Sequence, residues 1–169
     1  MSARLDDHSR PARHPKGEAL ADAPGEAVDL GLLDEFIGFH LRRAQEASFQ
    51  AYARRVGGSD LHPGRFALLV LISRNTGITP TALSRVAGRD KSSITPALRD
   101  LEARGLVGRS PAPGDRRSVV LHLTDAGEAR LAQLTVHALA HDAELDRIIG
   151  VSAKPAFLRQ LRRISEAFA

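Results

Sequence analysis

The stretch ITPTALSRVAGRDKSSITPALRDLEARGLV occupies positions 78–107, and it is followed by GDRRS at 114–118 and VVLHL at 119–123. Apolar residues recur at helical spacing up to Gly88, and a second stripe with the same spacing begins at Ile94. The pattern predicts two short helices joined by a tight turn. Two such helices form a helix-turn-helix. The second helix of this motif can lie in the major groove of DNA, so the pattern also indicates a DNA-binding function.

The second predicted helix carries side chains that suit a polyanion. Short hydroxyls stand near its start and long cations follow, and these can reach bases or phosphates: Lys91, Ser92, Ser93, Thr95 and Arg99. Serine and threonine at a helix start more often cap the helix than read bases, so this feature alone does not decide the function. The segment that follows strengthens the DNA-binding interpretation.

A β-hairpin is predicted after this helix. Gly105 suits the left-handed residue that commonly ends a helix, the prolines of 111–114 exclude helix, and 118–123 alternates as a strand does. Asp115, Arg116 and Arg117 then lie at the tip, where an arginine could enter a minor groove while Asp115 pairs with its neighbour. For an isolated tripeptide a solvated charged turn is the better explanation, and the preceding two helices reverse that preference.

These residues together resemble the MarR family of winged helix-turn-helix transcriptional regulators. The resemblance runs from Leu61-His62-Pro63 through the LxxLExxGLV motif at 98–107 and Asp115-Arg116-Arg117 to Leu123-Thr124-x-x-Gly127, and it spans roughly residues 32–168. It implies a mainly α-helical fold with a small β-hairpin wing, and a homodimer joined through its N- and C-terminal helices. The resemblance also implies repression at a palindromic operator, with Arg117 in the minor groove and the helix from Lys91 in the major groove.

Pro96 departs from the family pattern, which often has a polar or basic residue at this position of the recognition helix. A proline in a helix interior costs about 3 kcal/mol, whereas the first turn tolerates it. The regular helix is therefore predicted to start late, or to bend, near Ser92–Thr95.

The rest of the chain divides into further segments by its apolar spacing. We expect a flexible extension over 1–30, an N-terminal dimerisation helix within 31–60 that starts near Leu32, the DNA-binding region over 61–123, and C-terminal dimerisation helices over 124–169. Pro63 should open a second helix, apolar nearly all round, at the buried centre of the domain. Thr124 should cap a long helix that ends near Ile149, and Ser152 should cap the last one.

Composition agrees with a regulator and argues against an enzyme. Residues 59–123 carry ten basic and five acidic groups, which accounts for all of the excess positive charge of this 169-residue chain. The sequence has no cysteine, no phosphate loop, no nucleotide-binding glycine pattern and no His-Glu-x-x-His, and no cofactor is expected. The longest apolar run, Phe66–Ile72, is far below the ~20 residues of a membrane span, so a cytoplasmic protein is predicted.

A small-molecule effector is expected from the same resemblance. The segment FIGFHLRRAQ at 36–45 is similar to family members that sense aromatic acids or their coenzyme A thioesters. An anionic aromatic ligand would need apolar rings and cations, and the candidates are Phe36, Phe39, His40, Arg42, Arg43, Arg65 and Phe66. Taken singly, each phenylalanine is better explained as core, and each arginine as part of a solvated face or of a dimer ion pair; only the group suggests a ligand site.

Two other functions remain open at this point. His137 and His141, four apart on a helix, could begin a zinc site with His40 or Glu144, although two histidines are more often plain surface residues and no metal site is expected. An architectural DNA-binding protein without a ligand would share the basic wing and the dimer.

Overall fold

The computed structural model describes residues 28–57 and 63–168. In these ranges the chain forms one short 3₁₀ helix, six α-helices and one antiparallel hairpin, so the fold class expected from the sequence is confirmed. The chain divides into two units between Ala44 and Gln45, and each unit is described by itself. Most of the extension expected over 1–30 lies outside the described residues.

The first unit begins with the 3₁₀ helix Gly31–Glu35, and α1 (Ile37–Arg55) follows and crosses the boundary. The expectation of one continuous helix from Leu32 is wrong, because Phe36 adopts an extended conformation (φ −89°, ψ 113°) between the two helices. The Phe36 carbonyl instead accepts hydrogen bonds from the amides of Phe39 and His40, at 3.0 and 3.2 Å. Phe36 thus serves as the backbone cap from which α1 starts.

In the second unit, α2 (Pro63–Arg74) packs at the centre, as its all-round apolar sequence predicts. It contacts α3 (Pro80–Val86), α5 (Asp125–Ile149) and β2 (Asp115–Leu123). Nine side chains with less than 2% exposure form the interior of the unit: Leu68, Leu69, Ile72, Leu83, Ile94, Leu98, Leu101, Leu121 and Leu134. They come from α2, α3, α4 (Lys91–Ala103), β2 and α5, so one core holds all the elements of the predicted DNA-binding region.

Local side chains define the helix-turn-helix, which confirms the two-helix prediction. Thr79 caps α3 by accepting the amide of Ala82 at 3.2 Å, and Pro80 occupies the first turn, where it needs no hydrogen bond. Gly88 in the turn has φ +61°, a conformation that glycine adopts at little cost. Asp90 then caps α4 by accepting the amide of Ser93 at 2.7 Å.

The late start predicted for α4 is wrong. The helix begins at Lys91 and runs unbroken through Pro96 to Ala103. The Asp90 carboxylate secures the first turn by also accepting the Ser92 hydroxyl, at 2.7 Å. Pro96 therefore costs only the helical hydrogen bond to the Ser92 carbonyl, on an exposed side of the helix where water can replace it.

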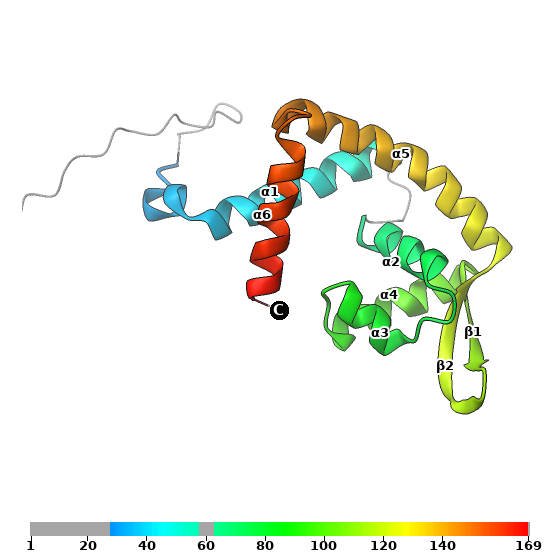
Figure 1. The fold of residues 1–169 in the computed structure, drawn as a ribbon. Coiled ribbons are helices and arrows are strands. Elements are labelled where there is room, and N and C mark those ends of the chain that lie inside the picture. The colour runs from blue at the N-terminus through cyan, green and yellow to red at the C-terminus, as the bar shows by residue number, and fades with distance from the viewer. Residues whose placement is uncertain (1–27, 58–62, 169) are drawn as a thin grey trace, which may run out of the picture. The chain divides into compact units, whose positions relative to one another are not determined.

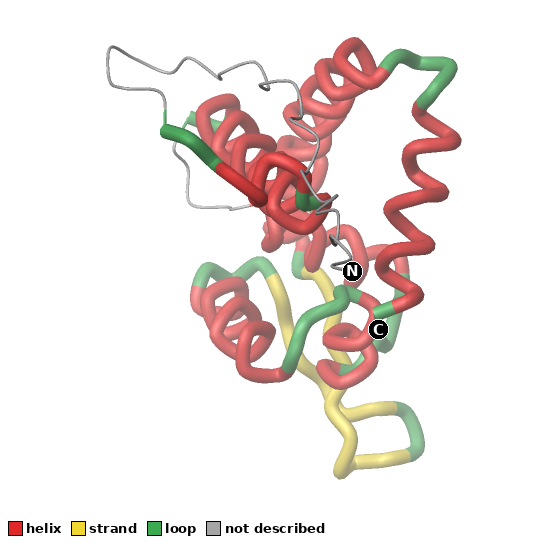
Figure 2. Tube along the Cα trace, turned by 90° about the vertical axis from the view of Figure 1, so that its left-hand side faces the viewer, coloured by secondary structure: helices red, strands yellow, loops and turns green. Residues whose placement is uncertain are grey.

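The wing follows a helix end of the kind that the sequence predicted. Gly105 has φ +67°, and the amide of Leu106 reaches back to the Leu101 carbonyl at 2.9 Å, which closes α4. β1 (Val107–Ala112) then pairs antiparallel with β2, Val107 opposite Leu123, around a turn at 113–114. The amide of Leu121 donates to the Ile78 carbonyl at 2.9 Å, so β2 is held against the loop before α3. The hairpin extends beyond the helices of this unit (Figures 1 and 2).

α5 begins where Thr124 caps it, as expected, and ends at Gly150. The Thr124 oxygen accepts the amide of Gly127 at 3.0 Å and donates to the Gly105 carbonyl at 2.6 Å, which ties α5 to the end of α4. Gly127 is required here, because a Cβ at this position would overlap the Leu106 carbonyl.

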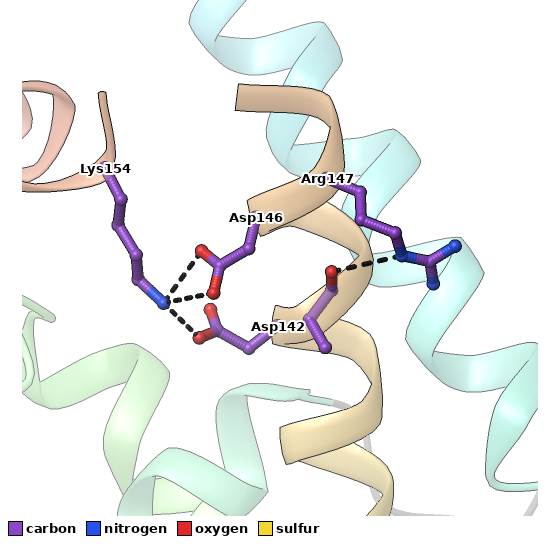
Figure 3. Close-up of polar contacts among 5 residues, drawn as sticks. Asp142, Asp146, Arg147 and Lys154 are labelled. Carbon is purple, nitrogen blue, oxygen red and sulfur yellow. Dashed lines mark hydrogen bonds and ion pairs between the residues drawn. The ribbon is translucent and has the colours of Figure 1, made fainter. Parts of the chain in front are cut away.

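The last helix, α6 (Lys154–Ala167), is capped differently from the prediction. Ser152 is wrong as the cap: Ala153 occupies that position without a side-chain hydrogen bond, and the Gly150 carbonyl accepts the amides of Ala153 and Lys154. The Lys154 ammonium instead reaches α5 and binds Asp142 at 2.7 Å and Asp146 at 2.8 Å (Figure 3). None of the helices in the described ranges combines the length and apolar character of a membrane span.

Candidate DNA-reading surface and effector pocket

The helix α4 has two chemically different sides. Ile94, Leu98 and Leu101 face the core, and each is at most 2% exposed. The opposite side is exposed and carries Ser92, Pro96 and Arg99 at intervals of four and three residues, with Ser93 and Thr95 flanking them. The residues expected to read DNA therefore share the solvent side of one helix.

The remaining candidates are placed only by their backbone. Lys91 is the first residue of α4, and Arg116 and Arg117 are the second and third residues of β2, directly after the turn of the wing. The Asp115-Arg116-Arg117 sequence therefore starts a strand at the distal end of the hairpin. The side chains of these residues lie outside the described part of the structure.

The acidic residues of α4 are paired with cations. Asp100 forms ion pairs with Arg65 of α2 at 2.8 Å and with Arg104 at 3.0 Å, and Glu102 pairs with Arg109 of β1 at 2.6 Å. Within the described residues, no carboxylate pairs with Arg99. Ion pairing thus neutralises the carboxylates of α4 and leaves a cation on its exposed side, which suits an approach to phosphates.

Asp90, the cap of α4, is also an anion on the solvent side. A hydrogen bond from the Ser92 hydroxyl, followed by one from the Ser93 amide, lowers the pKa of the Asp90 carboxyl below its ordinary value of 3.8. The carboxylate therefore stays charged at neutral pH and fixes the first turn. The Ser92 oxygen keeps lone pairs that can accept a hydrogen bond from a base.

A pocket of about 620 Å³ lies in the second unit, at the end of α1 between α2 and α5. Apolar side chains form most of its lining, and they come from all three helices: Phe49, Phe66, Val70, Leu131, Ala138 and Leu139. Ser48, Tyr52 and His141 add polar groups, and Arg74 and Asp142 add charges. Its size and its mixture of apolar walls with a few polar groups are typical of small-molecule sites.

Two polar atoms of residues that line this pocket are buried without a partner among the described residues. They are the Tyr52 hydroxyl and Nδ1 of His141, and Tyr52 is only 3% exposed. The two rings meet edge to face, with centroids 6.0 Å apart, and Nε2 of His141 lies 2.9 Å from the Ser48 hydroxyl. A buried polar group without a hydrogen bond is costly, so either atom would be stabilised if a side-chain movement brought it a partner.

The Tyr52 hydroxyl is a hydrogen-bond donor at neutral pH. Burial raises the pKa of the phenol above its ordinary value of 10.0, and the positive charge of Arg130 opposes this only in part. When the Ser48 hydroxyl donates to Nε2 of His141, Nδ1 carries the proton and becomes a second donor. These two residues of the pocket lining then each carry one donor.

The expected effector residues fall into both units. Phe66 lines the pocket, with its ring centroid 6.2 Å from that of Tyr52, whereas Arg65 pairs with Asp100. The other five candidates belong to the first unit, where Arg43 stacks over Phe39 at 5.7 Å from the ring centroid and His40 packs edge-on against Phe39. Phe36 is 53% exposed and Arg42 is also exposed. The effector roles of all these residues remain predictions.

Sequence reasoning missed Ser48, Tyr52 and His141 as parts of one site. A signal was present, since Tyr52 is the only tyrosine of the chain and stands one helical turn after Ser48 on α1. His141 had been considered only as a zinc ligand. No group of three or more His, Cys, Asp or Glu that could hold a metal occurs among residues 28–57 and 63–168. Glu144, the other zinc candidate on α5, pairs with Arg55.

Comparisons with known proteins identify the family. The model of the MarR family matches residues 61–119. A protein of Thauera aromatica, described as a transcriptional regulatory protein for the hcr operon, is 32% identical over 153 residues, which cover 90% of this chain and 92% of that protein. The chain therefore belongs to the MarR family, whose members are transcriptional regulators and not enzymes.

Solved structures agree with this assignment. The repressor CouR bound to a 23-mer DNA duplex superposes with a TM-score of 0.75 at 33% identity, covering 83% of this chain and 99% of that chain. CouR bound to p-coumaroyl-CoA superposes with a TM-score of 0.73 at 31% identity, covering 82% and 97%. A protein of the same fold thus binds both DNA and an aromatic acyl thioester.

Proposed function

We propose that this protein is a homodimeric repressor that binds a palindromic operator and releases it when an anionic aromatic compound, or its coenzyme A thioester, binds the pocket. The observation that carries this proposal is the pair of buried, unpartnered polar groups of the pocket lining, Tyr52 Oη and His141 Nδ1. Tyr52 belongs to α1 and His141 to α5, and α5 and α2, which both line the pocket, also contribute to the core holding α4.

The DNA contacts of the proposal rest on shape and charge. The exposed side of α4 would enter the major groove, and Arg116 and Arg117 at the start of β2 would reach an adjacent minor groove. Residues 59–123 carry the net positive charge of the chain. Affinity for the operator should therefore fall steeply as salt rises, because bound cations release counterions from DNA.

The dimer of the proposal rests on uncovered apolar side chains near the end of the chain. No residue of α6 is buried, and Ile148, Val151 and Phe168 are 81%, 75% and 89% exposed. A second copy of the chain would cover such a surface and would present two reading helices. With both on one face of the duplex, the half-sites would lie about 34–36 Å apart.

The chemistry of the pocket favours an aromatic ligand with an acceptor group. The rings of Phe49 and Phe66 and the aliphatic walls suit an aromatic body, and the Tyr52 and His141 donors suit a carboxylate or a thioester carbonyl. The p-coumaroyl-CoA bound by the related CouR has both parts. We therefore propose p-coumaroyl-CoA and p-coumarate as the first compounds to examine.

The pocket and the DNA-reading helix share structural elements. α2 contributes Phe66 and Val70 to the pocket, contributes Leu69 to the core, and holds Asp100 of α4 through Arg65. A ligand shifts such an equilibrium only by its difference in affinity between two arrangements. We propose that the occupied pocket favours an arrangement of α2 and α5 in which the two α4 helices no longer fit successive major grooves.

The test measures operator binding by fluorescence anisotropy on the DNA upstream of the protein's own gene, with and without each compound. Tyr52→Phe removes only the hydroxyl, so we expect wild-type operator affinity and about a tenfold weaker effector response. Thr135→Val is the matched control. Thr135 also lines the pocket, but its hydroxyl already donates to the Leu131 carbonyl at 2.8 Å, and the effector response should be unchanged.

Each part of the proposal can fail separately. Equal binding to every duplex would point to an architectural protein instead. If the protein bound its operator specifically, but no aromatic acid or thioester changed its operator affinity or its melting temperature, the effector part of the proposal would be wrong. If light scattering at micromolar concentration gave the mass of a monomer, the proposed dimer would be wrong.

A further inference from the structure

Pro96 lies in the middle of the solvent side of α4. At 100° per residue, the buried positions 94, 98 and 101 centre on one side of the helix, and Pro96 and Ser92 straddle the opposite direction. Arg99 follows Pro96 by three residues on the same side. If α4 enters the major groove, Pro96 is therefore among the side chains that come nearest to the floor of the groove.

Helix stability does not account for this residue. Proline is the least favourable residue in a helix interior, and here it deprives the Ser92 carbonyl of its helical donor. Burial does not account for it either, since Pro96 is exposed. What the ring adds to this surface is a rigid apolar group among hydroxyls and a cation.

The major groove contains one apolar group that can match such a ring. Among the four bases only thymine carries a methyl group there, at C5, whereas cytosine has a hydrogen at that position. We propose that Pro96 selects a thymine in each half-site of the operator by packing its ring against the 5-methyl group. This inference rests on the proposed placement of α4 in the major groove.

The side chains next to Pro96 on α4 can make the polar contacts to DNA. The Ser92 oxygen and the Thr95 hydroxyl can hydrogen-bond to base edges, and Arg99 can reach a base or a phosphate. The ring of Pro96 has no donor or acceptor. Discrimination at its base pair is therefore apolar and depends on one methyl group, unlike discrimination at the positions read by its neighbours.

The test replaces each thymine of the operator, one position at a time, by deoxyuridine, which keeps every hydrogen-bonding atom and removes only the methyl group. The operator is first located by footprinting, and affinities are then measured for the full-length protein. For the wild type, one symmetry-related pair of thymines should show a loss of about fourfold per half-site. All other thymines that lack a methyl contact should show no change.

The variant Pro96→Ser removes the ring and should abolish the deoxyuridine effect at that pair alone. Ala103→Ser, seven residues further along the same exposed side of α4, is the matched control and should keep the wild-type pattern. Far-UV circular dichroism checks that both variants fold. Replacing a proline within a helix is not expected to unfold it.

The results separate this inference from the proposed function. A flat deoxyuridine profile in the wild type, or the same loss in Pro96→Ser as in the wild type, would overturn the role of Pro96 while operator binding stood. If the wild type bound operator and random duplexes equally, the proposed operator recognition itself would fail.

Discussion

The candidate DNA-reading elements, α3, α4 and the β1–β2 hairpin, differ from the last helix, α6, in the contacts that hold them in the fold. The nine most deeply buried side chains all belong to the core formed by α2–α4, β2 and the first half of α5. In α6 no side chain is buried, and its described attachment to α5 includes the ion pairs of Lys154 with Asp142 and Asp146 (Figure 3). Within the described residues, the candidate reading elements therefore surround one buried core, whereas α6 keeps partly exposed apolar side chains, among them Phe157 and Leu158.

The strongest challenge to this comparison is a pair of leucine truncations. Leu101→Ala in the core should cost about 3 kcal/mol of unfolding free energy, because it leaves a cavity among fully buried neighbours. Leu158→Ala on α6, where the leucine is 37% exposed, should cost less than about 1 kcal/mol at concentrations that favour single chains. Urea unfolding at two protein concentrations measures both. Equal losses, independent of concentration, would contradict the comparison.

The contact between α5 and the wing gives the next largest effect. Gly127→Ala places a methyl group on the Leu106 carbonyl, which must shift, and we expect a loss of about 1–3 kcal/mol. Gly38→Ala on α1 is the control, since nothing lies within 4 Å of its Cβ position and alanine favours helix. Thermal unfolding of the two variants should therefore shift in opposite directions.

A smaller effect is expected at the cap of α5. Thr124→Ala removes the hydrogen bonds to the Gly127 amide and the Gly105 carbonyl and should cost about 1 kcal/mol. Thr81→Ala, at an exposed position of α3, should stay within about 0.5 kcal/mol of the wild type. Chemical denaturation decides whether Thr124 joins the reading elements to α5 as described.

The cap of α4 should make the stability of the fold depend on pH in the acid range. Hydrogen bonds lower the pKa of Asp90 in the folded state. The ionised carboxylate therefore adds to the free energy of unfolding above the ordinary pKa of 3.8, and this stabilisation is lost as pH falls through the folded pKa. Asp90→Asn keeps a capping oxygen without the charge. Melting curves of this variant and the wild type should differ at pH 6, and the difference should shrink below pH 3.8 and vanish once the pH is below the folded pKa.

The smallest effect is expected at α6 and has the opposite sign of pH dependence. Hydrogen bonds to Asp142 and then to Asp146 raise the pKa of Lys154 above its ordinary value of 10.5. The charged ammonium therefore adds to the free energy of unfolding below pH 10.5, and this stabilisation is lost as pH rises through the folded pKa. Lys154→Gln should melt below the wild type at pH 8, and the gap should close in strong alkali. A constant gap would show that charge is not what attaches α6.

Much of the local structure of the candidate DNA-reading surface could be predicted from the sequence. The turn at Gly88, the end of α4 at Gly105, the start of α5 at Thr124 and the exposed positions of α4 all follow from local rules of capping and periodicity. The start of α4 was predicted wrongly because the proline penalty was weighed without the Asp90 cap, whose carboxylate secures the first turn. The extended break at Phe36 and the cap of α6 could not be predicted for the opposite reason, since backbone carbonyls, and not side chains, define those helix starts.

The sequence by itself determined the class of protein. Helix periodicity, caps and turn glycines depend on residues that are close together in the chain, so they can be recognised from the sequence alone. Only the tertiary structure decided the pocket. Ser48 and Tyr52 are separated from His141 by about ninety positions, and their contact depends on how α1 and α5 pack. Whether a buried hydroxyl has a partner is likewise a property of the packed chain. No local pattern records it, and for this reason the effector residues expected from the sequence and those lining the pocket share only Phe66.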